Sequence, residues 1–335
     1  MRILAVDSGT TTTRVWALDD GAVLGTRSTR LGARDVARDS GRERLLKHIA
    51  RLAGETFDEV GGDWETLDAV VAFGMITSEL GLEEVPHLEA PVTPIDIAGR
   101  LERRDYAPDI PVPTYLVPGV RWNGNQGAGS TDFMRGEETE IAGLLDLDDA
   151  EPPLLYISPG SHTKFVTVDE GCKILWSYTT LSGELIWGLA QETILAGLLD
   201  PAWTGNDRTM VEHGADFART YGLTRALYAT RLMNRLDDVP PAACSAHVHG
   251  AVAGTDLDGL EALRDRLAVP LPSRVRVAAD GGLGDAYLAL LDNRAWTGSV
   301  SAITEPLGPA GAWRLFVHNR ERYSPRIEPA GGTRS

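Results

Sequence analysis

Three things are scarce in this sequence: cysteine, long apolar runs and positive charge. The two cysteines, Cys172 and Cys244, form neither a metal-ligand nor a redox spacing, so we expect a reducing, cytoplasmic setting. No apolar run approaches the ~20 residues that a membrane-spanning helix needs, and the first residues do not form a signal peptide. The 32 basic and 48 acidic residues give a net charge of −16, which argues against partners such as nucleic acid or an anionic membrane.

The chain is long enough for more than one hydrophobic core. Its 335 residues exceed the roughly 150 residues of a typical domain, which predicts two domains. Charged residues make up 24% and hydrophobic residues 43%, as is usual for a globular protein. We expect a first domain at 1–147, a second at 148–303 and a partly disordered tail at 304–335, with a hinge at 146–153. A homodimer is compatible with this sequence, which does not fix the oligomeric state.

Residues 3–18, ILAVDSGTTTTRVWAL, form the most informative segment. An apolar strand ends in a carboxylate, Asp7, and a turn rich in glycine and threonine leads into a second strand. Carboxylates hold Mg²⁺, and clustered N–H and O–H groups hold phosphate oxygens, so this hairpin favours a metal–nucleotide phosphate. An ordinary hairpin in which Asp7 only caps the turn stays open as the alternative. The turn residues expected to contact phosphate are Gly9, Thr10, Thr11 and Thr12.

The same pattern recurs in the second half of the chain. Residues 154–169, LLYISPGSHTKFVTVD, again read as a strand, a glycine-centred turn with hydroxyls, and a strand. A pair of related domains, each presenting one hairpin to a nucleotide in the cleft between them, explains both copies at once. Lys164 would neutralise charge that develops on the γ-phosphate, as fixed cations do in phosphoryl transfer. The residues of this second phosphate turn are Gly160, Ser161, Thr163 and Lys164.

A third glycine turn follows a late strand. In VRVAADGGLGDAYLALL, residues 275–291, Gly281 and Gly282 separate a strand from a helix. Glycine lets a ligand approach the backbone closely, and a purine or ribose is the natural candidate here. The spacing is not that of a dinucleotide-binding motif.

Hydrophobic periodicity and turn residues predict the remaining elements. Apolar residues at helical spacing predict a helix over 42–57, and a short apolar run predicts a buried strand over 69–73. The glycine- and asparagine-rich residues 121–131 predict a loop. An acidic first turn predicts a helix that begins at Asp132. Two further expectations are a helix at 184–199 and an edge strand at 313–317.

This layout, with two phosphate hairpins and a late Gly-Gly turn, resembles the actin/hexokinase/acetate-kinase ATPase superfamily. The resemblance implies an α/β fold with two ribonuclease-H-like domains around a nucleotide cleft. Four segments resemble the 2-dehydro-3-deoxygalactonokinases, over a stretch from about residue 3 to about residue 290. These segments are FGMITSELGLEEVPHL (73–88), MRGEET (134–139), SPGSHTKFV (158–166) and LSGEL (181–185).

The family resemblance implies an enzyme that uses ATP and Mg²⁺. Members of that family phosphorylate the terminal 6-hydroxyl of 2-dehydro-3-deoxy-D-galactonate, so the resemblance implies this reaction. Asp7 would then hold the hydrated Mg²⁺ that bridges the β- and γ-phosphates. The sequence departs from the family at 121–131, at about 296–335 and in the 280–282 turn, which leaves the exact sugar acid open.

The MRGEET segment contains the candidate base. Phosphoryl transfer to a sugar hydroxyl needs a carboxylate near that hydroxyl, which Glu137 or Glu138 would supply. An acidic first helical turn, favoured by the helix dipole, explains the same two residues, and Asp132 is a further candidate for the base. Arg135 would meet the substrate carboxylate. The expected sugar-side residues are Gly74, Met75, Ser78 and Arg135.

Two other functions stay open. The Gly-Glu-Glu element is similar to one in exopolyphosphatases of the same superfamily, which favours a phosphohydrolase or ATPase that acts without a sugar. An actin-type nucleotide-binding regulatory protein is the non-enzyme alternative. The sequence contains no appended DNA-binding motif or membrane helix to support that alternative.

Overall fold

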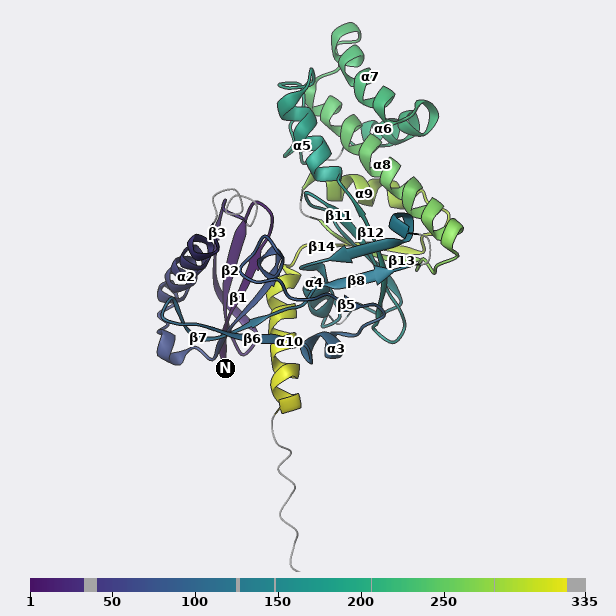
Figure 1. Cartoon of the computed structure of the whole chain (residues 1–335). Helices are drawn as coiled ribbons and strands as arrows, with labels where there is room; N and C mark the ends of the chain where they lie inside the picture. Colours follow the sequence, from purple (N-terminus) through teal and green to yellow (C-terminus); the bar gives the residue numbers. More distant parts are fainter. Residues whose placement is uncertain (33–40, 125–126, 148, 206, 280, 324–335) are drawn as a thin grey trace, which may run out of the picture.

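The chain folds into two α/β lobes, joined by a short sheet and by helices that lie between them (Figure 1). This architecture confirms the predicted α/β class. Within the described part of the chain, no helix is long and apolar enough to cross a membrane. Cys172 and Cys244 are both free. The computed structural model describes residues 1–32, 41–124, 127–147, 149–205, 207–279 and 281–323.

The first lobe contains a six-stranded sheet whose central strands are buried. From one edge to the other, its strands are β3 (Ala22–Thr29), β2 (Thr13–Asp19), β1 (Arg2–Ser8), β4 (Ala69–Gly74), β7 (Ile110–Leu116) and β6 (Glu102–Tyr106). β1 pairs antiparallel with β2 and parallel with β4. Both apolar runs predicted to form strands, at 3–6 and 69–73, are buried in the sheet. Apolar burial on both faces of β1 and β4 is what parallel strands between covering helices require.

The second lobe repeats this topology. Its strands, in spatial order, are β12 (Ile174–Thr180), β11 (Thr163–Val168), β10 (Leu154–Ser158), β13 (Arg274–Ala278) and β14 (Ser299–Ile303). β10 pairs antiparallel with β11 and parallel with β13, as β1 does with β2 and β4. The shared strand order confirms that the two predicted hairpins open two units of the same topology.

Helices cover the outer faces of both sheets and fill the space between the lobes (Figure 1). On the first lobe, α2 (Arg42–Glu59) buries the apolar stripe Leu45, Ile49 and Leu52, as its periodicity predicts. The second lobe carries α5 (Ser182–Glu192), α6 (Arg208–Tyr221), α7 (Leu223–Leu236), α8 (Pro241–Leu267) and α9 (Gly282–Leu291). Between the lobes lie α3 (Pro94–Ala98), α4 (Glu137–Leu144) and α10 (Leu307–Tyr323).

Two element predictions in the second half of the chain are wrong. Residues 313–317 belong to α10 and not to an edge strand, because α10 packs against α3, α4 and β1 and buries Leu315 and Phe316 there. The helix predicted at 184–199 ends at Glu192, since Thr193 takes up an extended backbone conformation. The end of the predicted tail, 324–335, lies outside the described residues.

The predictions for 121–131 and Asp132 are also wrong in part. β8 (Val120–Asn123) and β9 (Thr131–Met134) form an antiparallel hairpin around η3 (Gly127–Ser130), and β5 (Leu88–Glu89) pairs with β8. Asp132 therefore lies on a strand. α4 begins only at Glu137, because Gly136 has a φ of 116°, which helical backbone does not allow.

A backbone contact and an aromatic contact join the two lobes. The N–H of Val92 donates to the Ile174 carbonyl at 3.2 Å, and the Ile174 N–H donates back at 2.8 Å. The Trp122 and Trp176 rings lie 6.1 Å apart between centroids. The segment around β5, β8 and β9 is therefore fixed against β12.

α4 and α10 cross at two glycines. A Cβ on Gly311 would lie 1.8 Å from the Thr139 carbonyl oxygen, and a Cβ on Gly143 would lie 2.2 Å from the Leu307 carbonyl oxygen. Glycine is thus required at both positions, because only it lets the two backbones approach so closely. The crossing holds the start of α4, with its glutamates, in a fixed place.

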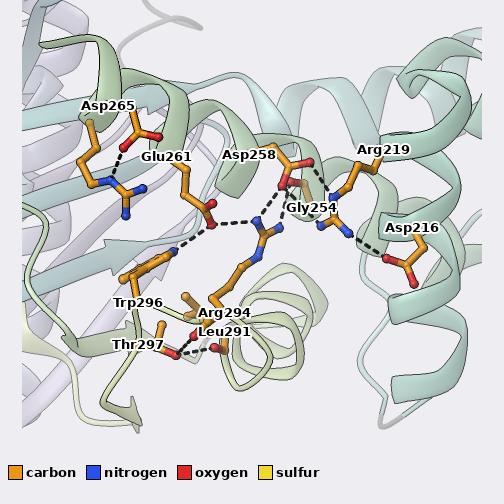
Figure 2. Close-up of polar contacts among 11 residues, drawn as sticks. Asp216, Arg219, Gly254, Asp258, Glu261, Asp265, Leu291, Arg294, Trp296 and Thr297 are labelled. Atoms are coloured by element: carbon orange, nitrogen blue, oxygen red, sulfur yellow. Dashed lines mark hydrogen bonds and ion pairs between the residues drawn. The ribbon is translucent and has the colours of Figure 1, made fainter. Parts of the chain in front are cut away.

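Charged residues bind the second-lobe helices to the segment after α9, as Figure 2 shows. The Arg294 guanidinium donates to Asp258 at 2.6 Å and to Glu261 at 2.8 Å, both on α8. The Trp296 indole N–H donates to Glu261 at 2.8 Å, and Arg219 of α6 reaches Asp258 at 3.3 Å. This network ties α6 and α8 to the chain that follows α9.

We expect Gly311→Ala to destabilise the protein, because the added Cβ would overlap the Thr139 carbonyl. Overpacking of this kind costs about 1–3 kcal/mol. Gly188→Ala in α5 is the matched control, since a Cβ there meets nothing within 4 Å. The control should be neutral or slightly stabilising. Urea unfolding curves check the prediction, and equal midpoints for Gly311→Ala and the wild type would contradict it.

Candidate active site

Asp7 lies at the end of β1, where three backbone segments meet. A Cβ on Gly74, at the end of β4, would lie 2.8 Å from Asp7 Oδ1, and the φ of 81° at Gly74 also favours glycine. A Cβ on Gly136, just before α4, would lie 3.5 Å from Gly74 Cα. The two glycines therefore bring the turn after β4 and the start of α4 against the first hairpin.

The surroundings of Asp7 disfavour its charge. Burial raises the pKa of Asp7 to about 6, although the Arg14 guanidinium, 3.4 Å away across the hairpin, opposes the rise. Glu137 raises the pKa further. The Asp7 side chain is still 21% exposed, so a cation or ligand can reach it.

The turn between β1 and β2 is closed by a backbone hydrogen bond. The Gly9 N–H donates to the Thr12 carbonyl at 2.9 Å. Thr11 is exposed, and Thr10 and Thr12 are partly exposed. Thr13, by contrast, is buried and donates its hydroxyl to a backbone carbonyl. The turn thus leaves three of its four threonines accessible to a ligand.

The two predicted glutamates at the start of α4 have different environments. Glu138 is fully buried; its Oε2 accepts the Gly136 N–H at 2.8 Å, and its Oε1 accepts the Thr139 hydroxyl at 3.0 Å. Burial raises the pKa of Glu138 to about 8. Burial also raises the pKa of Glu137, and within the described residues its buried Oε2 has no hydrogen-bond partner.

Glu140 was not among the residues predicted from the sequence, but it joins α4 to the second lobe. Its Oε2 accepts the hydroxyls of Tyr156 and Ser158 on β10, both at 3.0 Å. Burial raises the pKa of Glu140 to about 8, and Glu137 and Asp7 add to the rise. Glu140 lies three residues after Glu137, so helical spacing places both on one face of α4. That spacing is the signal by which the sequence could have identified it.

Asp132 and Lys164 meet in a polar seam between the lobes. Asp132 Oδ2 accepts the Thr179 hydroxyl at 2.7 Å, and Lys164 Nζ donates to Thr179 Oγ1 at 2.7 Å. Lys164 Nζ also donates to the Phe133 carbonyl at 2.6 Å. The Lys164 charge lowers the pKa of Glu137, whereas Asp132 raises it. The structure thus brings the three predicted groups Asp132, Glu137 and Lys164 together.

The start of α5 supports the second phosphate turn. The Glu184 N–H donates to the Ser161 carbonyl at 2.9 Å, and a Cβ on Gly183 would overlap the Gly160 carbonyl. Gly160 and Ser161 are exposed, whereas Thr163 is buried at the start of β11. The exposed part of this turn is therefore its tip.

The third glycine turn is confirmed as the junction of β13 and α9. Gly281 has a φ of 88°, and a Cβ on Gly282 would lie 1.9 Å from the Trp203 carbonyl oxygen. Both positions require glycine, the first for its backbone conformation and the second for space. Asp280 lies outside the described residues.

A buried carboxylate connects this junction to α5. Asp256 of α8 accepts the Tyr287 hydroxyl of α9 at 2.5 Å and the Thr180 hydroxyl at 3.1 Å, and it also accepts the hydroxyl of Ser182 at the start of α5. Burial raises the pKa of Asp256. The network holds the helix behind the second hairpin and the helix after the glycine turn in one arrangement.

The predicted sugar-side residues gather around the turn after β4. Met75 belongs to η2 (Met75–Thr77), and Ser78 donates its hydroxyl to the Met75 carbonyl at 2.7 Å. Arg135 Nη1 donates to Thr77 Oγ1 at 3.0 Å, and its Nη2 donates to the Val85 carbonyl at 2.6 Å. Arg135 is thus fixed beside this turn.

A separate cavity of about 610 Å³ lies in the second lobe at the charged network of Figure 2. Its lining includes Asp216, Glu261 and Arg294 and none of the predicted site residues. In the described part of the chain, no group of three or more His, Cys, Asp and Glu side chains forms a ready metal cage. The candidate active site is the junction of the two hairpins with the start of α4, because Asp7, Glu137 and Lys164 influence one another there.

The repeated topology and the paired hairpins define a protein of the actin/hexokinase-like ATPase fold. An activator of 2-hydroxyisocaproyl-CoA dehydratase from Clostridium difficile, solved with bound ADPNP, matches with a TM-score of 0.54 and 12% identity, covering 96% of this chain and 97% of that one. Component A of (R)-2-hydroxyglutaryl-CoA dehydratase from Acidaminococcus fermentans matches with a TM-score of 0.51 and 12% identity, covering 96% and 98%. These two likenesses concern the fold.

Within this class, the chain belongs to the 2-keto-3-deoxy-galactonokinase family, whose model matches residues 7–315. The 2-dehydro-3-deoxygalactonokinase of Escherichia coli K12 is 28% identical over 256 residues, which cover 75% of this chain and 73% of the relative. The crystal structure of a candidate 2-dehydro-3-deoxygalactonokinase from Sinorhizobium meliloti matches with a TM-score of 0.70 and 25% identity, covering 96% and 99%. The protein is accordingly a phosphotransferase with an alcohol group as acceptor, which decides against the hydrolase and regulatory alternatives.

We expect Glu138→Gln to flatten the pH dependence of the free energy of unfolding. The pKa of Glu138 is about 8 in the folded protein, against an ordinary value of 4.5, so the folded protein binds an extra proton between these pH values. Stability should therefore fall as pH rises through this window, by up to about 1.4 kcal/mol per pH unit. Glutamine can still accept the Gly136 N–H but does not titrate.

Urea unfolding at pH 5, 6.5 and 8 checks this prediction, with the exposed Glu192→Gln as the control substitution. The stability of Glu138→Gln relative to wild type should improve as pH rises, whereas the control should follow the wild type. Parallel pH dependences of Glu138→Gln and wild type would show that Glu138 does not hold its proton.

Proposed function

We propose that the protein transfers the γ-phosphoryl group of ATP to the 6-hydroxyl of 2-dehydro-3-deoxy-D-galactonate, giving the 6-phosphate and ADP. The family assignment supports a kinase of this class. The observation that carries the proposal is the grouping of Asp7, Glu137 and Lys164 at the junction of two matching hairpins. These residues offer a carboxylate for a metal, a second carboxylate whose Oε2 has no hydrogen-bond partner among the described residues, and a cation, as phosphoryl transfer to an alcohol requires.

The nucleotide would lie between the three glycine turns. Gly9, Thr10, Thr11 and Thr12 would contact the phosphates from the first lobe, with Gly160 and Ser161 opposite, and Gly281 would lie against the ribose or purine. Thr163 and Lys164 are buried at the start of β11, and Gly282 is buried against the Trp203 carbonyl, so these three contacts stay predictions from the sequence. Clustered backbone N–H groups in tight turns suit phosphate oxygens. The partly exposed threonines and the exposed tip of the second turn support this arrangement.

The residues around Asp7 fit a hydrated Mg²⁺. This ion keeps several waters and is usually held by one or two carboxylates together with substrate phosphates, so a full protein cage is not needed. Glu137 raises the pKa of Asp7, and Glu137 Oε2 is buried without a partner among the described residues, so negative charge here is incompletely balanced. Asp7 would hold the ion, which supplies charge stabilisation on the β- and γ-phosphates when bound.

Of the three candidates for the base, the geometry favours Glu137. Both oxygens of Glu138 already accept hydrogen bonds. The carboxylate of Asp132 accepts the hydroxyls of Ser177 and Thr179. Glu137 Oε2 has no such partner among the described residues, which leaves it free to accept the proton of the sugar hydroxyl. We assign that proton to Glu137, late in a loose, in-line transfer.

The sugar acid would lie against the first lobe. Gly74, Met75 and Ser78 would line its pocket, and Arg135 would bind its carboxylate. The lobes would act as the domains 1–147 and 148–303, with α10 packed on the first, and closure about 146–153 would exclude water and suppress ATP hydrolysis. Cytoplasmic location and a homodimer stay predictions from the sequence.

An assay of ADP release from Mg·ATP tests the proposal. We expect 2-dehydro-3-deoxy-D-galactonate to accelerate ADP release strongly, and mass spectrometry to find the phosphate on O6. The C4 epimer serves as the stereochemical comparison. ADP release that is no faster with either acid than without it would contradict the kinase reaction.

We expect Glu137→Gln and Glu138→Gln to have unequal effects on kcat. Glu137→Gln should lower kcat by about 10²–10⁴-fold with little change in the KM of ATP, because it removes the proton acceptor. Glu138→Gln, equally isosteric, should keep near-normal kcat at neutral pH, because both of its oxygens hold the start of α4. Steady-state kinetics of both variants and of Asp132→Asn check this. Loss of kcat in Asp132→Asn with normal kcat in Glu137→Gln would identify Asp132 as the base.

A further inference from the structure

The Arg135 guanidinium carries a charge without a paired carboxylate. Its two shortest hydrogen bonds go to neutral acceptors, the Thr77 hydroxyl and the Val85 carbonyl. Glu138, and then Glu79 and Glu84, lie near enough to favour its charge, but no carboxylate of the described residues forms an ion pair with it. A half-buried cation of this kind favours an anionic ligand.

His87 lies against Arg135 and holds an unused donor. Arg135 Nη2 is 3.4 Å from His87 Nδ1, and a guanidinium can only donate, so Nδ1 is the accepting nitrogen. Burial lowers the pKa of His87 to about 4, with a further contribution from Arg135, so the ring is neutral and its proton is on Nε2. His87 Nε2 is buried and has no acceptor among the described residues.

A second histidine shows why the combination matters. His48 on α2 also has its Nδ1 3.4 Å from an arginine, Arg51, and a buried Nε2 without a partner among the described residues. Arg51, however, forms an ion pair with Glu55 at 2.8 Å, so its charge is already balanced. Of these two histidines, only His87 combines an unused N–H with an arginine that lacks a paired carboxylate.

We propose that Arg135 and His87 together bind the 2-oxo acid end of the substrate. The substrate carboxylate takes the guanidinium, and the adjacent 2-oxo oxygen accepts from His87 Nε2–H. This assignment rests on the proposed kinase function and adds His87 as the residue that recognises the oxo group. A ketone oxygen only accepts hydrogen bonds, which matches a site whose free groups only donate.

The Phe133 ring connects His87 with Lys164, which lies near the candidate base Glu137. The His87 and Phe133 rings pack edge to face with 5.6 Å between centroids, and Lys164 Nζ lies 5.6 Å from the centroid of the same Phe133 ring. Phe133 is 60% exposed, so its ring offers an apolar surface that connects the two. A carbon chain lying over Phe133 carries its far hydroxyl toward Lys164 and Glu137.

Two substitutions separate the donor of His87 from its acceptor. His87→Asn keeps an acceptor for Arg135 but has no donor at the ε position, whereas His87→Gln restores an N–H there. We expect His87→Asn to raise the KM of the sugar acid about five- to tenfold, with kcat and the KM of ATP within about twofold, and His87→Gln to recover most of the loss. His48→Asn is the matched control and should change none of the three.

Binding without turnover gives an independent test. Wild-type protein with ¹⁵N-labelled histidine is titrated with 2-dehydro-3-deoxy-D-galactonate in the absence of ATP. We expect the Nε2 resonance of His87 to shift and that of His48 to stay. Pyruvate, which carries the same 2-oxo acid end without the sugar chain, should cause the same shift at higher concentration.

The outcomes distinguish this assignment from the proposed function. If the wild type phosphorylates the acid and His87→Asn leaves its KM unchanged, or raises the KM of ATP equally, the role of His87 is wrong and the kinase function stands. If pyruvate shifts His87 but the sugar acid is not phosphorylated, the oxo-acid site stands and the kinase reaction is wrong. If neither acid shifts His87, the oxo-acid site is wrong whatever the kinetics show.

Discussion

The close crossing of α4 and α10 is the contact on which the candidate active site depends. At Gly143 and Gly311 the two backbones touch with no room for a side chain, so α4 cannot shift along or away from α10 without breaking the contact. α10 packs on the first sheet, and Glu140 of α4 bonds to β10 of the second. α4 thus contacts both lobes, and its packing on α10 sets the position of Glu137 relative to Asp7.

The same arrangement buries several carboxyl groups close together and so disfavours their charged forms. Burial is the main cause of the raised pKa at Asp7 and at Glu137, Glu138 and Glu140, and the neighbouring carboxylates add to it. Arg14 and Lys164 balance only part of the negative charge. Perturbed pKa values cluster at functional sites, so these residues, and not the cavity of about 610 Å³ beside Arg294, mark the candidate site.

The features that could be predicted from the sequence lie within single turns or helices. The hairpin around Asp7, its repeat in the second half and the turn at Gly281 each depend on residues a few positions apart. The contacts that complete the site join distant segments: Lys164 reaches the carbonyl of Phe133, 31 residues away, and Glu140 reaches Ser158. Such pairs leave no local pattern in a single sequence.

The wrong element predictions have the same origin. The mainly apolar residues 313–317 fit a strand or a helix equally well, and packing against α4 decides for the helix. The acidic turn after Asp132 correctly indicated a helix start, but the conformation of Gly136 moves that start to Glu137. The strand before it exists because β8 pairs with it, and this pairing depends on a partner that local propensity does not reveal.

The two hairpins share a topology but not a charge pattern. Asp7 stands opposite Arg14 on the first pair of strands, whereas Ser158 stands opposite Lys164 on the second. The first pair of strands therefore carries an acidic and a basic side chain at this place, whereas the second carries a hydroxyl and a basic side chain. If both pairs of strands carried the same residues, the two sides of a cleft between them would be chemically equivalent. The hydroxyl of Ser158 in place of a carboxylate thus makes the two sides of the predicted nucleotide cleft chemically different.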